Sequence, residues 1–336
     1  MLEKVTELAI KEKQISDFHL RGGSDIAYRK LGDIVIEPNS KIEEKDLEEL
    51  LKLNCSEHEL KVFKDVKELD CAIMLGELRF RANFYQTMNG TGAVLRRVET
   101  VAPNMEDLNL PPVLYQLLDV HKGLVLVTGP TGSGKSTTLA AIINQINDQR
   151  QSNIITIEDP VEFIHKDKQS IVSHREVGKQ TKSFSNALRA ALREDPDVIL
   201  VGELRDLETI GLALTAAETG HLVFGTLHTS GAPNTINRII DVFPPEQQSQ
   251  IRAQIAESLK MVVTQKLFKK KDNSGRIGAF EIMVCNAPIK NLIREAKIHQ
   301  IPTVMQTAQR EGMIQMEKSI EAVSYTHLTL PTRRGV

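Results

Sequence analysis

The stretch GPTGSGKS, from Gly129 to Ser136, decides the fold class of this 336-residue chain. It fits the pattern G-x-x-x-x-G-K-[ST] in full, and it stands between an apolar run, GLVLVTG, and a helix-like segment, STTLAAIINQIN. A loop between a strand and a helix presents backbone N–H groups and a helix N-terminus to a phosphate. The sequence therefore predicts a P-loop fold that binds a nucleoside triphosphate.

Individual positions of this loop have separate chemical roles. Gly132 and Gly134 let the backbone approach the phosphate oxygens, and Lys135 supplies a cation for the β- and γ-phosphates. The hydroxyl of Ser136 is a ligand for Mg²⁺, so the expected cofactors are ATP and Mg²⁺. The predicted ATP-binding residues are Thr131, Gly132, Ser133, Gly134, Lys135, Ser136 and Thr137.

The residues around the loop alternate between short apolar strands and helices. Such alternation is typical of a mostly parallel, doubly wound α/β sheet. From Pro245 onward the pattern is helical, with Ile251, Ile255 and Leu259 on one face, so we expect C-terminal helices there. The predicted strands are GLVLVTG, NIITIEDP, DVILVGE and HLVFGTLHT, and the predicted helices between the later strands are FSNALRAALRE and ETIGLALTAAETG.

The rest of the chain divides by pattern into further segments. Residues 1–98 indicate a small α+β module with an opening helix and further helices near 43–53 and 56–66. Its predicted strands are FHL, IVIE, DCAIML, LRFRANF and GAVLRRV. The proline-containing segment 99–113 is expected to be a linker, and residues 114–322 the P-loop domain. The last residues, VSYTHLTLPTRRGV (323–336), do not continue the helical pattern before them, which predicts a non-native or disordered tail.

Composition excludes several classes of protein. The chain is 41% apolar with a net charge of −2, so nothing predicts stable nucleic-acid binding. No stretch approaches the roughly 20 apolar residues that span a bilayer, so we expect a soluble, cytoplasmic protein that meets membranes through partners. The three cysteines, Cys55, Cys71 and Cys285, are far apart in sequence and are expected to be reduced thiols.

A P-loop NTPase also needs a carboxylate that orders the attacking water. The apolar strand VILV ends in Gly202 and Glu203, where many such enzymes have Asp-Glu, so Glu203 is the candidate base. At the end of a neighbouring strand, IEDPVE offers three acids, Glu158, Asp159 and Glu162. Glu162 is the candidate for the acid that faces the metal water or the γ-phosphate. The alternative for Glu158 and Asp159 is that they are solvated carboxylates at a strand end. Either Glu203 or Glu162 could also contact Mg²⁺ through water.

Two histidines and a set of arginines are weaker candidates. His221 and His228 flank the strand LVFGTL, and a structural role is the alternative for each. Arg79 and Arg81 alternate with apolar residues, so they share one face of a strand, and hairpin pairing could bring Arg96 near them. The alternative for these arginines is a solvated basic face.

The sequence up to about Ala322 resembles a known family. The run from Leu192 to Thr229 is similar to the signature of the type II/type IV secretion ATPase superfamily. Further matching pieces are the P-loop, the Asp box TIEDPVEFIH, the Walker B segment DVILVGE, and the His box from Gly220 to His228. Near the C-terminus, APIKNLIREAK resembles the Ala-Ile-Arg-Asn-Leu-Ile-Arg motif of the pilus-retraction branch.

The resemblance implies a hexameric ring of subunits, each with a PAS-like N-terminal domain and a RecA-like C-terminal domain. It implies ATP between these domains and an inner-membrane platform protein as the partner, so the ring would be peripheral to the inner membrane. The residues that match the functional positions of the family are Glu203, Glu162, Arg81, Arg96, His221, His228 and Arg238.

The implied function is an ATPase motor that powers type IV pilus retraction and twitching motility. Pilus assembly or type II secretion is the first alternative, which the absence of a tetracysteine zinc module disfavours. A RecA-like DNA translocase and a non-hydrolysing nucleotide-gated scaffold are further alternatives. Lys290 replaces the first arginine of the C-terminal motif, which keeps the charge but loses the planar guanidinium fork.

Overall fold

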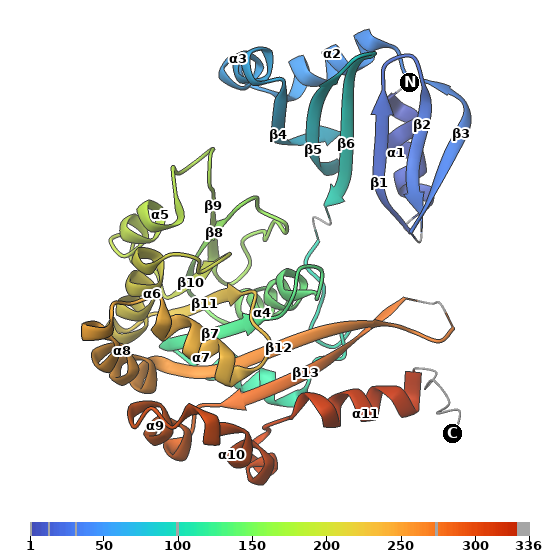
Figure 1. Cartoon of the computed structure of the whole chain (residues 1–336). Helices are drawn as coiled ribbons and strands as arrows, with labels where there is room; N and C mark the ends of the chain where they lie inside the picture. The colour runs from blue at the N-terminus through green and yellow to red at the C-terminus, as the bar shows by residue number, and fades with distance from the viewer. Residues whose placement is uncertain (1, 13, 31, 99–100, 273–274, 328–336) are drawn as a thin grey trace. The chain divides into compact units, whose positions relative to one another are not determined.

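The computed structural model describes residues 2–12, 14–30, 32–98, 101–272 and 275–327 (Figure 1). The chain divides into two compact units, Met1–Val101 and Ala102–Val336. Part of the expected linker, residues 99–100, lies outside the described residues. The domain boundaries given above, and the PAS-like character of the first domain, remain predictions.

The N-terminal unit contains a six-stranded antiparallel sheet with the strand order β3-β2-β1-β6-β5-β4. Its strands are β1 (Ile15–Arg21), β2 (Asp25–Lys30), β3 (Asp33–Lys41), β4 (Glu68–Leu75), β5 (Leu78–Thr87) and β6 (Gly90–Val98). Its helices are α1 (Leu2–Lys11), α2 (Glu44–Asn54) and α3 (Glu57–Val66). The sequence predicts these helices and most of these strands, but it misses β2.

Side-chain alternation explains how this sheet forms a core. In β5, Phe80, Ala82 and Phe84 are fully buried, while Arg81 between them is exposed. The buried residues belong to one apolar cluster with residues of all three helices. The opposite face carries Arg81 and Arg96, which are direct partners in the β5·β6 pair, as the hairpin argument predicts.

The N-terminal core also brings together two cysteines that are distant in sequence. Cys55 follows α2 and Cys71 lies in β4, yet their Sγ atoms are 3.6 Å apart and both residues are buried. Their separation along the chain gave no sign of this contact. Both remain thiols, as the sequence predicts.

Asp17 in β1 is a buried carboxylate that holds Arg96 in place. Arg96 Nε donates to Asp17 Oδ1 at 2.7 Å. Burial acts to raise the pKa of Asp17, but hydrogen bonds from Arg96 and Ser16 and the charge of Arg96 outweigh it and lower the pKa below its ordinary value. A lowered pKa means that Asp17 stabilises the fold above the ordinary carboxyl pKa and loses this contribution as the pH falls through its lowered value.

We therefore expect Asp17→Asn to lower the melting temperature at neutral pH by a few degrees. The expected loss is about 1 kcal/mol, less than is usual for a hydrogen bond to a charged group, because the guanidinium is mostly exposed and screened by solvent. Scanning calorimetry from pH 7 to pH 3 should show the two melting temperatures converging below about pH 4. A difference that is constant with pH would show that the Asp17 charge contributes nothing.

The C-terminal unit contains a seven-stranded sheet with the order β13-β12-β7-β11-β10-β8-β9. All neighbours pair in parallel except β12 and β13. The strands are β7 (Gly123–Thr128), β8 (Asn153–Glu158), β9 (Ile171–Glu176), β10 (Val198–Val201), β11 (Leu222–Leu227), β12 (Leu259–Lys269) and β13 (Arg276–Val284). The helices are α4 (Lys135–Gln149), α5 (Phe184–Ala191), α6 (Leu207–Thr219), α7 (Ala232–Asp241), α8 (Pro245–Ser258), α9 (Ala287–Arg294), α10 (Ile301–Thr307) and α11 (Met316–His327), with a 3₁₀ segment η1 (Pro112–Asp119).

Helices cover both faces of this sheet, which confirms the doubly wound α/β prediction. Val125 and Val127 of β7 pack with α4 and η1 on one face. Leu124 and Leu126 of the same strand pack with α5, α6, α7 and α8 on the other. The strands are therefore apolar throughout, as expected for a parallel sheet buried on both sides.

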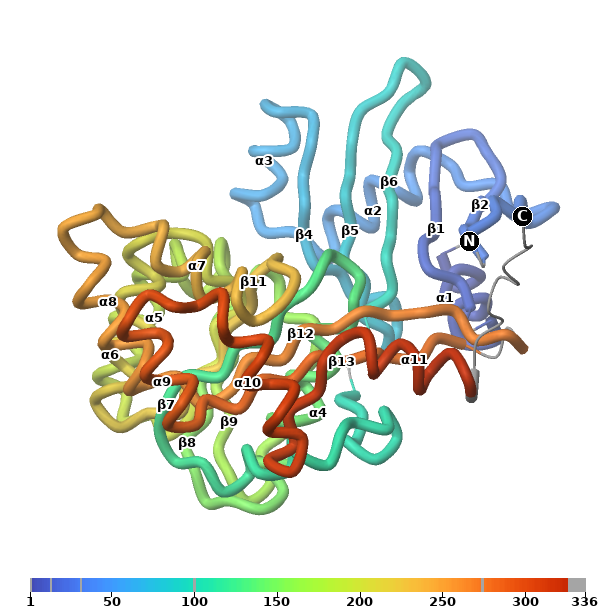
Figure 2. The backbone as a smooth tube through the Cα atoms, turned by 60° about the horizontal axis from the view of Figure 1, so that its bottom comes forward, coloured from blue at the N-terminus to red at the C-terminus, as the bar shows by residue number. Residues whose placement is uncertain are grey.

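The expectation of continuous helix after Pro245 is wrong beyond Ser258. Leu259 begins a long antiparallel hairpin of β12 and β13, which run side by side in Figures 1 and 2. The spacing of Ile251, Ile255 and Leu259 reflects only α8 and its C-cap. The β-branched run Val262-Val263-Thr264 then favours a strand, and β12 finds its partner in β7. The sequence also misses β9.

The predicted break of the last helix at residue 323 is wrong for residues 323–327, because α11 continues to His327. The helix packs on β13, where the Phe280 N–H donates to Ser319 Oγ at 2.9 Å, and Ser324 is buried. This packing surface, which the local sequence pattern cannot reveal, stabilises the extra turn. The rest of the predicted tail, residues 328–336, lies outside the described residues.

Candidate active site

The phosphate loop connects β7 to α4 and is built for close backbone approach. Gly129 and Gly134 have φ values of 140° and 90°, which residues with side chains rarely adopt. A Cβ atom on Gly129 would lie 2.4 Å from the Gln265 carbonyl oxygen, and one on Gly134 would lie 2.8 Å from Gln265 Nε2. Glycine is therefore required both by the backbone conformation and by the wall that β12 forms.

Gln265 is a functional position that sequence reasoning misses. Its Oε1 accepts a hydrogen bond of 2.7 Å from Thr138 Oγ1 in α4, and its backbone abuts Gly129. Thr264 beside it shares a hydrogen bond of 2.9 Å with Thr128, the last residue of β7. Strand β12 thus supports both ends of the phosphate loop, although its contacts there join residues 136 and 127 positions apart in the chain.

The loop residues fit a nucleotide phosphate. Ser133 Oγ is buried and has no hydrogen-bond partner among the described residues, which leaves a polar atom to satisfy. Lys135 is 8% exposed, and its Nζ donates to the carbonyl oxygens of Gly129 at 2.9 Å and Pro130 at 3.1 Å. A cation beside the N-terminus of α4 makes this a site for an anion.

Burial lowers the pKa of Lys135, and the charges of Glu203 and Glu162 act in the opposite direction. Both predicted acids therefore lie close enough to Lys135 to act on its charge, as a site around one phosphate group requires. Glu162 stands in the loop that follows β8. The role of Glu162 at the metal water or the γ-phosphate remains a prediction.

Glu203 follows β10 and is held by two partners. Arg205 Nε lies 2.5 Å from Glu203 Oε1, Arg205 Nη2 donates to Oε2 at 2.6 Å, and His228 Nε2 lies 3.5 Å from Oε2. Burial acts to raise the pKa of Glu203, but Arg205 and His228 outweigh it, so the pKa is below its ordinary value. The carboxylate is therefore ionised at neutral pH, the state that a general base needs.

The structure also explains why Gly202 replaces the aspartate found before the glutamate in many P-loop enzymes. A Cβ atom at this position would lie 3.2 Å from the Ile157 carbonyl oxygen and 3.3 Å from Glu158 Cα. The Gly202 N–H donates to the same Ile157 oxygen at 2.7 Å. Strand β8 thus leaves little room for a side chain at position 202, which fits the glycine found there.

The two histidines lie at opposite ends of β11. His228 follows the strand at its carboxyl end, where its Nδ1 lies 3.5 Å from Thr131 Oγ1 of the phosphate loop. His221 precedes the strand, its Nδ1 lies 2.9 Å from the Ala216 carbonyl oxygen, and its own carbonyl accepts from the first residue of β7. The structure therefore brings His228, but not His221, to the phosphate loop of its own chain.

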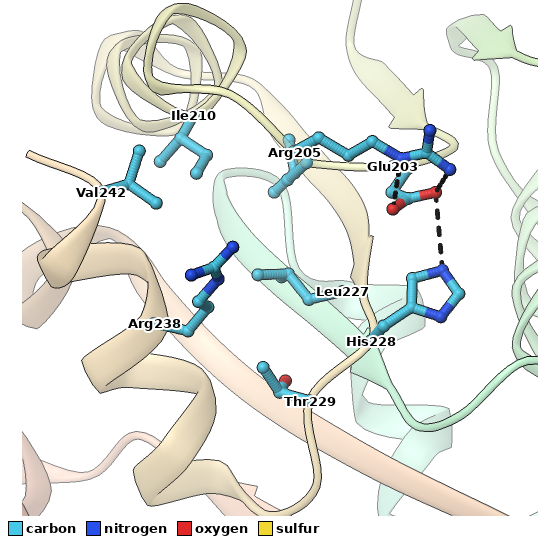
Figure 3. Close-up of a pocket in the computed structure, with 9 residues that line it drawn as sticks. Glu203, Arg205, Ile210, Leu227, His228, Thr229, Arg238 and Val242 are labelled. Carbon is cyan, nitrogen blue, oxygen red and sulfur yellow. Dashed lines mark hydrogen bonds and ion pairs between the residues drawn. The ribbon is translucent and has the colours of Figure 1, made fainter.

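A pocket of about 380 Å³ adjoins Glu203 (Figure 3). Arg238 of α7 points into it, and Arg205 lies along its edge beside Glu203. The lining residues are Glu203, Leu204, Arg205, Ile210, Leu227, His228, Thr229, Arg238 and Val242. Arg238 is thus close to the candidate base, whereas Arg81 and Arg96 belong to the N-terminal unit, and their action at the phosphate remains a prediction.

Comparison with known proteins places this arrangement in a family. A family model described as type II/IV secretion system protein matches residues 61–330. The chain belongs to the type II/IV secretion system protein family. The match continues through residues 323–330, so the expectation that the family resemblance ends near Ala322 is wrong for these residues.

Relatives within the type II/IV secretion system family match most of the chain. A twitching motility protein of Neisseria gonorrhoeae is 50% identical over 277 residues, which cover 82% of this chain and 74% of that protein. The type IV pilus retractation ATPase PilT of Pseudomonas aeruginosa is 46% identical over 322 residues, covering 95% and 93%. A crystal structure of the pilus retraction motor PilT with bound ADP superposes with a TM-score of 0.85 at 43% identity, covering 96% of both chains.

This secretion-family chain is therefore a nucleotide-binding ATPase with a RecA-like α/β unit. The residues that would hold Mg²⁺ are those of the prediction: Ser136 directly, and Glu162 or Glu203 through water. Among the described residues, no helix is long and apolar enough to cross a membrane.

We expect Lys135→Ala to weaken ATP binding by about 10- to 100-fold, the scale of one lost hydrogen bond to a charged group. Titration with a fluorescent ATP analogue measures this affinity directly. Lys122→Ala, a change of an exposed lysine before β7, is a suitable control. Unchanged affinity in the Lys135 variant would show that the nucleotide binds elsewhere.

Proposed function

We propose that this chain is a ring-forming motor that couples ATP hydrolysis to retraction of a type IV pilus, and so to twitching motility. The observation that carries the proposal is a phosphate loop with an ionised glutamate beside it, in a chain similar over its length to proteins named for pilus retraction and twitching. Glu203 would activate the attacking water, and Lys135 would neutralise charge on the terminal phosphates.

The assembly that we propose is a homo-hexamer with Mg²⁺–ATP, docked in the cytoplasm on an inner-membrane platform protein of the pilus. The roles of Arg81 and Arg96 fit a ring, because an arginine of one subunit could reach the nucleotide that is bound by the neighbouring subunit. Rigid-body rotation of domains on hydrolysis would transmit the force. His221 would act at such an interface rather than at the phosphate loop of its own chain.

Deletion of the gene, with surface pili counted by electron microscopy, tests the direction of force. Accumulation of pili together with loss of twitching is the result we expect. Cells without pili would instead make the chain an assembly or secretion ATPase, and complementation with the Lys135→Ala variant should fail to reverse either phenotype. Stoichiometric, salt-sensitive DNA binding that stimulates hydrolysis would favour a DNA translocase.

A further inference from the structure

The carboxylate of Glu203 is engaged on both oxygens by one neighbouring side chain. Arg205 approaches Oε1 with Nε at 2.5 Å and Oε2 with Nη2 at 2.6 Å, a two-pronged pair that Figure 3 shows from the side. Bidentate arginine–carboxylate pairs fix both oxygens in a plane and are among the stronger hydrogen-bonded pairs in proteins. Arg205 is not among the functional residues predicted from the sequence.

Engagement of both oxygens conflicts with the task of a base. A general base must accept a proton from the attacking water within hydrogen-bond distance. The guanidinium occupies the plane of the Glu203 oxygens, and its positive charge also favours the ionised form over the protonated form that follows proton transfer. With Arg205 in this position, Glu203 is therefore a poorer base than the same carboxylate on its own.

Arg205 is placed so that it can leave. Its side chain is 71% exposed, whereas that of Glu203 is 19% exposed, so the arginine can swing into solvent while the glutamate stays. The charge of Asp159, directly after β8, also acts on Arg205 and favours its charged form. Because the guanidinium is exposed, water competes for it and weakens the pair relative to a buried one.

Contacts also connect this pair to the phosphate loop. Thr131 Oγ1 lies 3.5 Å from His228 Nδ1, and His228 Nε2 lies 3.5 Å from Glu203 Oε2. His228 therefore contacts both the phosphate loop and the carboxylate that Arg205 holds. The chain Thr131–His228–Glu203–Arg205 thus joins the nucleotide site to the ion pair.

We propose that Arg205 is a positioning residue that restrains Glu203, so that hydrolysis of a bound nucleoside triphosphate requires this ion pair to open. This inference rests on the proposed ATPase role of Glu203. It deepens that role by assigning the side chain that limits how often Glu203 is free to act as a base on the bound nucleotide.

Single-turnover hydrolysis with excess enzyme tests the proposal, because it reports on the chemical step. Arg205→Ala should raise this rate about two- to fivefold, which is the equilibrium shift that an exposed ion pair can impose. The affinity for a fluorescent ATP analogue should stay unchanged. Arg205→Lys, which keeps the charge but loses the two-pronged geometry, should give a smaller rise. Arg175→Ala, which breaks a single-contact ion pair with Glu194, should have no effect.

A second comparison separates restraint of Glu203 from a general structural effect. In a Glu203→Gln background, adding Arg205→Ala should leave the residual rate unchanged, because the restraint has lost its target. A rate that falls or stays level in Arg205→Ala, while the wild-type chain hydrolyses ATP, overturns the proposal. A rise that persists in the Glu203→Gln background also overturns it. Failure of the wild-type chain to hydrolyse ATP overturns the proposed function instead, and this inference with it.

Discussion

Replacing Arg81 with Ala is expected to lower steady-state ATP hydrolysis on the order of 10³-fold, the contribution of an arginine finger in related phosphoryl-transfer systems. Arg81 lies directly opposite Arg96 in the β5·β6 pair, and like charges in this position repel. Asp17 pairs with Arg96, and the described residues give Arg81 no ion-pair partner. An exposed cation without an ion-pair partner is suited to contact the phosphates of a nucleotide that another subunit binds.

Arg79→Ala is the matched control, because Arg79 lies two residues earlier on the same strand and face but matches no functional arginine of the family. Its hydrolysis rate should stay within about twofold of wild type, because Arg79 is not assigned to the nucleotide. The melting temperature of the Arg81→Ala variant should be unchanged. Arg79 is half-buried and makes contacts of its own, so calorimetry must show that the Arg79→Ala variant is folded. Equal losses in the two variants would indicate a general effect of charge rather than a finger.

Mixing subunits tests whether Arg81 acts on the nucleotide of a neighbour. Arg81→Ala subunits keep the phosphate loop, and Lys135→Ala subunits keep the arginine, so mixed rings contain some interfaces with both groups intact. Partial recovery of hydrolysis on mixing two inactive variants would support action between subunits. If dilution to monomers leaves the wild-type rate unchanged, Arg81 is not donated by a neighbour and the proposed ring mechanism is wrong.

Glu203→Gln is expected to slow single-turnover hydrolysis by about 10²- to 10⁴-fold, the usual contribution of a positioned general base. Glutamine has nearly the same shape and can still contact Arg205 and His228, but its amide cannot take up the proton from water. The carboxylate that it replaces is ionised in the structure, since Arg205 and His228 hold its pKa below the ordinary value against the effect of burial.

ATP binding should survive in the Glu203→Gln variant, because Lys135 and the backbone of the phosphate loop are untouched. Equilibrium titration with a fluorescent ATP analogue measures this separately from turnover. Glu208→Gln, which alters an exposed carboxylate of α6 paired with Arg189, serves as the control and should leave both values unchanged. Loss of binding together with turnover would make Glu203 a structural residue.

Sequence alone was sufficient for the parts of this protein that consist of consecutive residues. The phosphate loop is such a part, because its glycines, Lys135 and Ser136 act through a local backbone conformation. Glu203 and His228 could be found in the same way, since each lies within two residues of the end of an apolar strand. The carboxyl ends of parallel strands meet at one edge of the sheet. The same logic identified the doubly wound sheet.

Only the tertiary structure could decide contacts between segments that are far apart in the chain. Gln265 supports the phosphate loop because β12 pairs with β7, and the helical pattern before it concealed that strand. His221 has the same residue type and neighbouring strand as His228, yet it lies at the other end of β11. Arg205 stands beside Glu203 in the sequence, but its bidentate contact depends on side-chain directions that no pattern records.

The physical reason for this division is the range of each interaction. Backbone conformation, helix caps and strand alternation depend on residues within a few positions of one another, so short sequence patterns are enough to predict them. Packing and ion pairing depend on which surfaces meet after folding, as the 3.6 Å contact of Cys55 with Cys71 and the extension of α11 on β13 show. Such contacts are fixed by the burial of whole faces, which single positions in a sequence do not encode.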